Sequence, residues 1–141
     1  MLLPDVNILV YAQREDLPAH ASARNWLESA LNGAEPVGLF NPTLASFLRI
    51  ITNRRIFKTP TPLPMALSFV ETIRAAPAAR PLNAGPNHWE LLARLCQDTS
   101  AGGDDIPDAY LAALAIENDC EFISTDGGFA RFPGLKLRRP F

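Results

Sequence analysis

The sequence has few cysteines and no long hydrophobic run. Only two cysteines, Cys96 and Cys120, occur among its 141 residues, without a CxxC spacing or a histidine pair nearby. This pattern argues against a zinc motif and against a disulfide-stapled scaffold. No apolar stretch approaches the roughly 18 residues that cross a bilayer, and the opening MLLPD lacks the basic start and apolar core of a signal peptide. We therefore expect a cytoplasmic protein with reduced cysteines and no membrane association.

The chain also lacks an excess of either charge. Its 13 basic and 15 acidic residues give a formal net charge of −2, which excludes a uniformly basic surface for coating nucleic acids. A local basic groove around an acidic centre is compatible with these numbers. With 48% hydrophobic and 20% charged residues, the composition is that of an ordinary globular protein. The length fits a single domain over residues 1–141.

Short apolar strands alternate with amphipathic helices along the chain. We expect strands at 2–5, 36–40, 80–82, 120–125 and 135–138. We expect helices at 7–13, 20–33, 44–52, 63–76, 86–100 and 107–118. Asn41 is expected to cap the third helix, and Pro86 to stand in the first turn of the fifth. This alternation predicts an α/β fold with a parallel sheet covered by helices on both faces.

Three aspartates are placed where such a sheet would bring them together. Asp5 ends the first apolar strand, Asp126 ends the strand at 120–125, and Asp108 opens the helix that leads into that strand. Ligand sites of open parallel sheets lie at the carboxyl ends of the strands. We therefore expect these carboxylates to meet at one edge of the sheet.

Such carboxylates need a counter-charge. At about 4 Å and an effective dielectric constant of 20, two of them repel by roughly 4 kcal/mol, which a shared proton or a cation relieves. An all-oxygen cluster favours Mg²⁺ or Mn²⁺ over zinc. Asn7, Ser124 and Thr125 are suited to orienting ligands or waters. Asp108 and Asp126 also have simpler interpretations, as a helix N-terminal residue and as a turn residue before two glycines.

Three segments carry a family resemblance. They are PDVNILVYA (4–12), DAYLAALA (108–115) and STDGGFARFPGLK (124–136). In order and spacing they resemble the three blocks of the PIN-domain family, and more specifically the VapC toxins of bacterial toxin–antitoxin pairs. The resemblance extends over essentially the whole chain, including the HWELL and SFLRIITN segments.

The resemblance implies a three-layer α/β/α sandwich around a Rossmann-like sheet, and a Mg²⁺-dependent endoribonuclease in which Mn²⁺ can substitute. A metal-activated water would hydrolyse RNA phosphodiester bonds. Asp5, Asp108 and Asp126 would be the catalytic residues and metal ligands, supported by Asn7 and Thr125. The implied partners are the RNA substrate, a cognate VapB-like antitoxin and a second copy of the chain in a homodimer.

One position departs from the family pattern. Many members carry a glutamate in a segment like A-E-L-L-R, where this chain reads ASFLR and has Ser46. Serine can hold a water but supplies no charge. Asp104, Asp105 and Glu117 would either compensate or be plain solvated acids. Ser46 therefore supports an alternative, a catalytically weak PIN module that binds RNA or an antitoxin without efficient cleavage.

Other classes of enzyme fit less well. A haloacid-dehalogenase-like phosphatase needs a DxDx[TV] loop, but the segment that begins at Asp5 reads DVNIL and lacks the second acid. No GxSxG signature of a serine hydrolase occurs. His20 and His88 have no nucleophile partner, and His88 is expected on a helix surface.

Further surfaces have two interpretations each. Two groups of basic residues would either bind RNA phosphates or form a solvated edge. They are Arg49, Arg54, Arg55 and Lys58 in the middle of the chain, and Lys136, Arg138 and Arg139 at its end. The aromatic residues Phe57, Phe129 and Phe132 would stack on bases or pack in the core. Helices 20–33 and 63–76 would form a groove for a partner helix or serve core packing, through Trp26, Leu27, Met65, Phe69 and Val70.

Overall fold

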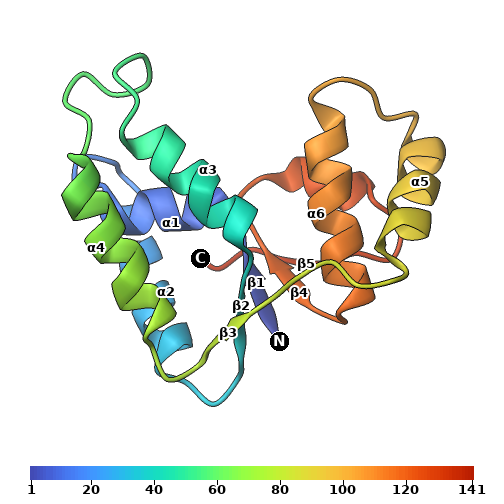
Figure 1. Cartoon of the computed structure of the whole chain (residues 1–141), viewed down its shortest axis with the longest axis horizontal. Coiled ribbons are helices and arrows are strands. Elements are labelled where there is room, and N and C mark those ends of the chain that lie inside the picture. The colour runs from blue at the N-terminus through green and yellow to red at the C-terminus, as the bar shows by residue number, and fades with distance from the viewer.

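A parallel five-stranded sheet forms the centre of the computed structural model, which describes residues 1–141 (Figure 1). The strands are β1 (Leu2–Pro4), β2 (Val37–Leu39), β3 (Ala79–Pro81), β4 (Glu121–Ile123) and β5 (Lys136–Arg138). Their order is β3-β2-β1-β4-β5, and every neighbouring pair is parallel. The predicted parallel sheet is thus confirmed, with β1 at its centre.

Helices cover both faces of this sheet, as predicted. They are α1 (Val6–Gln13), α2 (His20–Leu31), α3 (Asn41–Ile51), α4 (Leu63–Arg74), α5 (His88–Thr99) and α6 (Asp105–Glu117), followed by a 3₁₀ helix, η1 (Gly127–Arg131). Figure 1 shows α1 to α4 on one side of the sheet and α5 and α6 on the other. The helices that follow β1 and β2 cover one face, and the helices that lead into β4 cover the other. The topological switch point therefore lies between the neighbouring strands β1 and β4.

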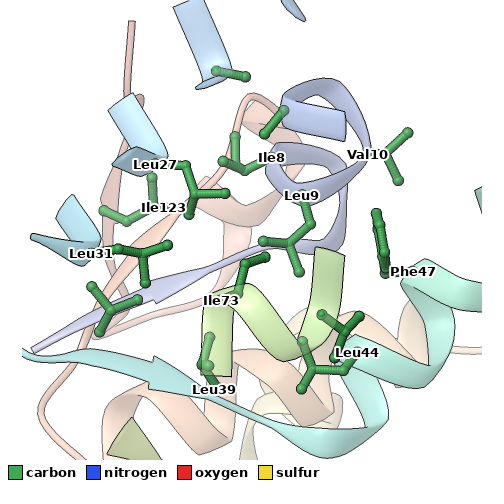
Figure 2. Close-up of a cluster of buried hydrophobic side chains, with 14 of the residues drawn as sticks. Ile8, Leu9, Val10, Leu27, Leu31, Leu39, Leu44, Phe47, Ile73 and Ile123 are labelled. Carbon is green, nitrogen blue, oxygen red and sulfur yellow. The ribbon is translucent and has the colours of Figure 1, made fainter. Parts of the chain in front are cut away.

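Each face has its own hydrophobic core. Figure 2 shows the first, where Ile8 and Leu9 of α1 meet Leu27 of α2, Phe47 of α3 and Ile73 of α4. The second core contains Phe122 of β4 and the fully buried alanines of α6. β1 and β2 are buried at every residue because both of their faces are covered.

Several helix boundaries differ from the prediction. Helix α6 begins at Asp105 rather than at residue 107, and Pro107 stands inside its first turn, where no backbone donor is needed. Helix α5 begins at His88 rather than at residue 86, so Pro86 precedes the helix. The expected cap at Asn41 is also wrong. Asn41 is the first residue of α3, and no side chain caps that helix.

Glu117 explains the late start of α5. Its carboxylate accepts hydrogen bonds from the backbone amides of Gly85 (2.6 Å) and Asn87 (2.8 Å). These bonds hold the residues before His88 in a turn. Of the two interpretations of Glu117, the helix-end acid fits, because its carboxylate is engaged at the end of α6 opposite to Asp105.

Cys96 and Cys120 are both free thiols, as predicted, and burial raises the pKa of the Cys120 thiol above its usual value. None of the helices combines the length and the hydropathy needed to span a bilayer.

Candidate active site

The carboxyl ends of β1 and β4 bring Asp5 into contact with Ser124. Pro4 pairs with Ile123 in the sheet, so the residues that follow the two strands lie level with each other. The hydroxyl of Ser124 donates a 2.6 Å hydrogen bond to Oδ2 of Asp5, and the backbone amide of Val6 donates a 2.7 Å bond to Oδ1. Asp5 is only 6% exposed, so the carboxylate that ends the first strand is buried but hydrogen-bonded on both oxygens.

Ser124 connects Asp5 to two more residues of the site. Its hydroxyl oxygen accepts hydrogen bonds from Nδ2 of Asn7 (3.3 Å) and from the backbone amide of Asp126 (3.0 Å). The predicted supporting residue Thr125 makes no side-chain hydrogen bond, and only its carbonyl oxygen accepts one, from Arg139. Of the two neighbouring hydroxyls, it is thus Ser124 that orients Asp5.

The three predicted aspartates share one electrostatic environment. Burial raises the pKa of Asp5 above its usual value, although the hydrogen bonds from Ser124 and Val6 oppose this effect. The negative charges of Asp108 and Asp126 raise it further. The carboxyl edge of the sheet therefore concentrates negative charge around a buried carboxyl group.

Arg131 neutralises part of this charge. Its Nη2 atom lies 3.0 Å from Oδ2 of Asp108 and 3.4 Å from Oδ1 of Asp105. The guanidinium group also lies 4.4 Å from the centre of the Phe132 ring and donates to the carbonyl oxygen of Gly128. Arg131 was not among the predicted site residues, and its only signal in the sequence is an arginine within FARFP, close behind the third aspartate.

The simpler interpretations of the other two aspartates have different outcomes. Oδ1 of Asp126 accepts a 2.8 Å hydrogen bond from the amide of Gly128 and so begins η1, as expected of a turn residue. Asp108 lies in the first turn of α6, but the cap position is Asp104, and no side chain there accepts a capping bond. The carboxylate of Asp108 is bound to Arg131 instead.

The oxygen ligands of Asp5, Asp108, Asp126 and Asn7 suit a hard divalent cation, but the aspartate side chains would have to move to bind one together. No three His, Cys, Asp or Glu side chains lie close enough together to hold a metal ion. Each predicted aspartate is bound to a partner of its own. The carbonyl oxygen Oδ1 of Asn7, however, is buried and has no hydrogen-bond partner. Carboxylate and amide oxygens are the ligands that Mg²⁺ and Mn²⁺ prefer, so the residues at this edge fit such an ion.

Ser46 lies next to this edge, in a cleft between α3 and α6. The cleft has a volume of about 430 Å³ and is lined by Ser46 together with Val6, Ile106 and Pro107, among others. Val6 directly follows Asp5, and Pro107 directly precedes Asp108. Ser46, which stands where many family members have glutamate, therefore lies beside the acidic edge, the name we give to Asp5, Asp108 and Asp126 near the carboxyl ends of β1 and β4. Of the acids considered as compensation, only Asp105 has a partner in this region, namely Arg131.

The structure shows where three predicted aromatic residues and His88 lie. Phe129 and Phe132 are each 2% exposed and belong to the second core, so they do not stack on bases. Phe57 is partly buried and lies beneath the guanidinium of Arg14, 4.1 Å away. The surface position expected for His88 is wrong. Its Nε2 lies 3.0 Å from the carbonyl oxygen of Tyr110, and the residue is 5% exposed.

The basic residues fall into a paired and an unpaired group. Lys136 lies 2.6 Å from Asp119, and Arg138 lies 3.0 Å from Glu121, so these two cations are largely neutralised. Four exposed residues at the end of α3 and in the loop that follows have no ion-pair partner: Arg49, Arg54, Arg55 and Lys58. Arg139 is also exposed and unpaired, and it donates to the carbonyl oxygen of Thr125. This second group is the better candidate for contacts with phosphates.

A groove also runs between α2 and α4, where a partner site was predicted. Its volume is about 320 Å³, and its apolar lining includes Leu27, Leu31, Met65, Phe69 and Ile73. Met65 is 57% exposed, although it is a large hydrophobic side chain. Two other predicted residues serve the core instead, because Val70 is buried and Trp26 packs against the first core.

Comparison with known proteins gives consistent similarities. A family model described as the PIN domain matches residues 2–135. Ribonuclease VapC43 of Mycobacterium tuberculosis is 49% identical over 140 residues, which cover 99% of this chain and 95% of that protein.

Solved structures with a similar fold include VapBC2 from Rickettsia felis bound to a DNA fragment from their promoter. It has a TM-score of 0.72 and 16% identity, over 98% of this chain and 97% of that chain. The structure of Mycobacterium tuberculosis VapC20, a sarcin–ricin loop cleaving toxin, has a TM-score of 0.70 and 14% identity, over 98% and 99%. At these identities the structures support the fold, and the chemistry has to be argued from the residues of this chain.

Proposed function

Because this chain belongs to the PIN-domain family, and within it to the VapC ribonucleases, we propose that it cuts RNA at the edge formed by Asp5, Asp108 and Asp126. The observation that carries this proposal is the buried carboxylate of Asp5, whose pKa is raised by its burial and by the other two aspartates. A cytoplasmic ribonuclease toxin of a VapBC-type pair is the function that fits this arrangement.

The aspartates and Oδ1 of Asn7 would hold Mg²⁺ or Mn²⁺. When bound, such an ion supplies the positive charge that activates a water molecule and offsets the charge developing on the phosphate. The chain itself keeps Asp5 oriented through Ser124 and excludes bulk water from its carboxylate. The unpaired cations of Arg49, Arg54 and Lys58 would bind the RNA backbone on either side of the cut.

The test is cleavage of a mixed RNA pool in Mg²⁺, in Mn²⁺ and in EDTA. We expect the wild type to cut only with a divalent ion, leaving a 5′-phosphate and a 3′-hydroxyl, and Asp5→Asn to lose the cleavage. Asp98→Asn is the matched control, because Asp98 is an exposed residue of α5 with no ion-pair partner. Cleavage by Asp5→Asn at the wild-type rate would rule out this edge as the active site.

Ser46 supports a second candidate function, an RNA- or antitoxin-binding module that cleaves poorly. The serine stands beside the acidic edge where a carboxylate would add charge for an ion. Under this alternative, the wild type and Asp5→Asn bind RNA equally well, and neither protein cuts it. Binding measured in EDTA, followed by cleavage measured after addition of Mn²⁺, separates the two functions.

A VapB-like antitoxin would bind in the groove between α2 and α4. The exposed side chain of Met65 and the apolar lining around Phe69 suit one face of an amphipathic helix. We expect Met65→Glu to lose co-purification with a co-expressed antitoxin while it still cuts RNA. Leu67→Glu is the control, since Leu67 is exposed on α4 but does not line the groove.

A homodimer is also part of the proposal. Trp89 on α5 is 74% exposed, which is unusual for a large aromatic side chain and suits a contact between subunits. Light scattering of the wild type and of Trp89→Ala tests this, with a dimer expected for the first and a monomer for the second.

A further inference from the structure

The ion pair between Arg131 and Asp108 has a consequence for the proposed cation site, on which the following inference rests. Nη2 of Arg131 is 3.0 Å from a carboxylate oxygen that would have to face the metal ion. An arginine is a permanent cation, because it does not deprotonate in proteins. We propose that Arg131 is a built-in competitor of the divalent cation: it holds Asp108 in the metal-free protein, and the ion has to displace it.

The position of Arg131 is fixed by more than its charge. The guanidinium group lies 4.4 Å from the centre of the Phe132 ring, donates to the carbonyl oxygen of Gly128 and bridges Asp105 to Asp108. A Cβ atom on Gly128 would come within 3.1 Å of Nη1, so the missing side chain makes room for it. Four contacts therefore place the guanidinium at the acidic edge.

Each of the three carboxylates is engaged by a partner of its own. Asp108 is turned to Arg131, Asp126 accepts from the amide of Gly128, and Asp5 accepts from Ser124 and Val6. Among these partners only Arg131 carries a charge. It is therefore the partner whose removal most increases the affinity of the edge for another cation, since both the competition and the repulsion between cations disappear.

The release of Arg131 would supply a second cation close to the metal ion. A freed guanidinium beside Phe132 is suited to a bidentate contact with a phosphate oxygen pair. Arg131 thus acts as a positioning residue: when the cation binds and displaces it from Asp108, its guanidinium group becomes free to bind the RNA backbone. In this arrangement the affinity for the cation is kept low until the substrate is also present.

Mn²⁺ binding measured by calorimetry without RNA tests the competition. We expect Arg131→Gln to bind Mn²⁺ about two- to fivefold more tightly than the wild type, because an exposed ion pair of typical strength no longer has to be broken. Arg131→Lys keeps the positive charge but loses the planar guanidinium fork, so its Mn²⁺ affinity should lie between those of the wild type and Arg131→Gln. Arg74→Gln, which removes a surface pair with Glu71 on α4, is the control and should change nothing.

The outcomes separate this inference from the proposed function. Unchanged or weaker binding by Arg131→Gln overturns the inference, while binding that is lost in Asp5→Asn still supports the cation site. Binding that Asp5→Asn leaves unchanged overturns the cation site instead. If neither the wild type nor Arg131→Gln binds Mn²⁺, both proposals fail. If Arg131→Gln does not fold, a crystal structure of the wild type with Mn²⁺ decides, because Nη2 and Asp108 should then lie beyond hydrogen-bond distance.

Discussion

The hydroxyl of Ser124 lies 2.6 Å from Oδ2 of Asp5, across 119 positions of sequence. This contact follows from the register of the sheet, in which Pro4 pairs with Ile123 at the last position of each strand. The next residue of each chain segment therefore emerges at the same level, at the switch point between β1 and β4. The sheet thus positions a buried carboxylate and the donor that keeps it oriented.

Replacing Asp5 should stabilise the protein when divalent ions are absent. The unfolded chain ionises Asp5 near pH 4, whereas burial and the neighbouring aspartates raise its pKa in the folded protein. The folded state therefore binds this proton more tightly, and the free energy of unfolding falls as the pH rises through the folded pKa. Asp5→Asn should escape this loss and gain about 1 kcal/mol by pH 7.

Urea denaturation in EDTA from pH 3.5 to 7.5 measures this difference. The gain of Asp5→Asn should be smallest at the acidic end and reach its full size near neutrality, while Asp98→Asn follows the wild type throughout. Added Mn²⁺ should stabilise the wild type but not Asp5→Asn. A difference in stability between Asp5→Asn and the wild type that stays the same from pH 3.5 to 7.5 contradicts the interpretation of Asp5 as a carboxylate buried at an energetic cost.

Ser124→Ala should shift the acidic limb of the pH–rate profile to higher pH. The hydroxyl lowers the pKa of Asp5 through its hydrogen bond, so its removal raises that pKa further. The variant also leaves Asn7 and the amide of Asp126 without their acceptor, at a cost of about 1–3 kcal/mol in stability. Thr125→Ala is the matched control, and an equal shift in both variants argues against a specific role of Ser124.

The sequence predicts which residues lie at the carboxyl ends of the strands better than it predicts the contacts that these residues make. The positions of Asp5 and Asp126 follow from apolar strands that end at them, because parallel strands present their carboxyl ends together. The pairing of Arg131 with Asp108 depends on the direction in which η1 turns after β4. No periodic sequence pattern predicts a 3₁₀ helix of five residues. Side-chain partners were thus missed where they depend on a turn rather than on a repeat.

His88 and Arg14 show the same limit in the core. His88 was expected on a helix surface, but its Nε2 donates to the backbone carbonyl oxygen of Tyr110 in α6. Arg14 is buried beside Asp16 and donates to the carbonyl oxygen of Thr59, 45 positions away. Buried polar groups are paired through the tertiary structure, so local sequence does not identify their partners.

Glu117→Ala should destabilise the protein by about 1–2 kcal/mol without changing catalysis, because two backbone amides lose a charged acceptor. Gly85→Ala should cost a similar amount, since a Cβ atom there would lie 2.8 Å from Oε2 of Glu117. The two changes disrupt one contact, so the double variant should lose less than the sum. Glu71→Ala, which removes an exposed pair, is the control, and a fall in cleavage rate with unchanged stability would instead favour a catalytic role for Glu117.

Ser46→Glu should strengthen cation binding, since the position lies in the cleft between Val6 and Pro107, the neighbours of Asp5 and Asp108. An added carboxylate there should raise the Mn²⁺ affinity about tenfold and increase the rate of cleavage. In EDTA the same charge should lower the free energy of unfolding by about 1 kcal/mol, because it repels the other carboxylates. Calorimetry and urea denaturation measure both effects, and Ser46→Gln is the control of equal size without the charge. If the two variants bind Mn²⁺ alike, α3 does not contribute to the cation site, and the weak-cleavage interpretation of Ser46 loses its basis.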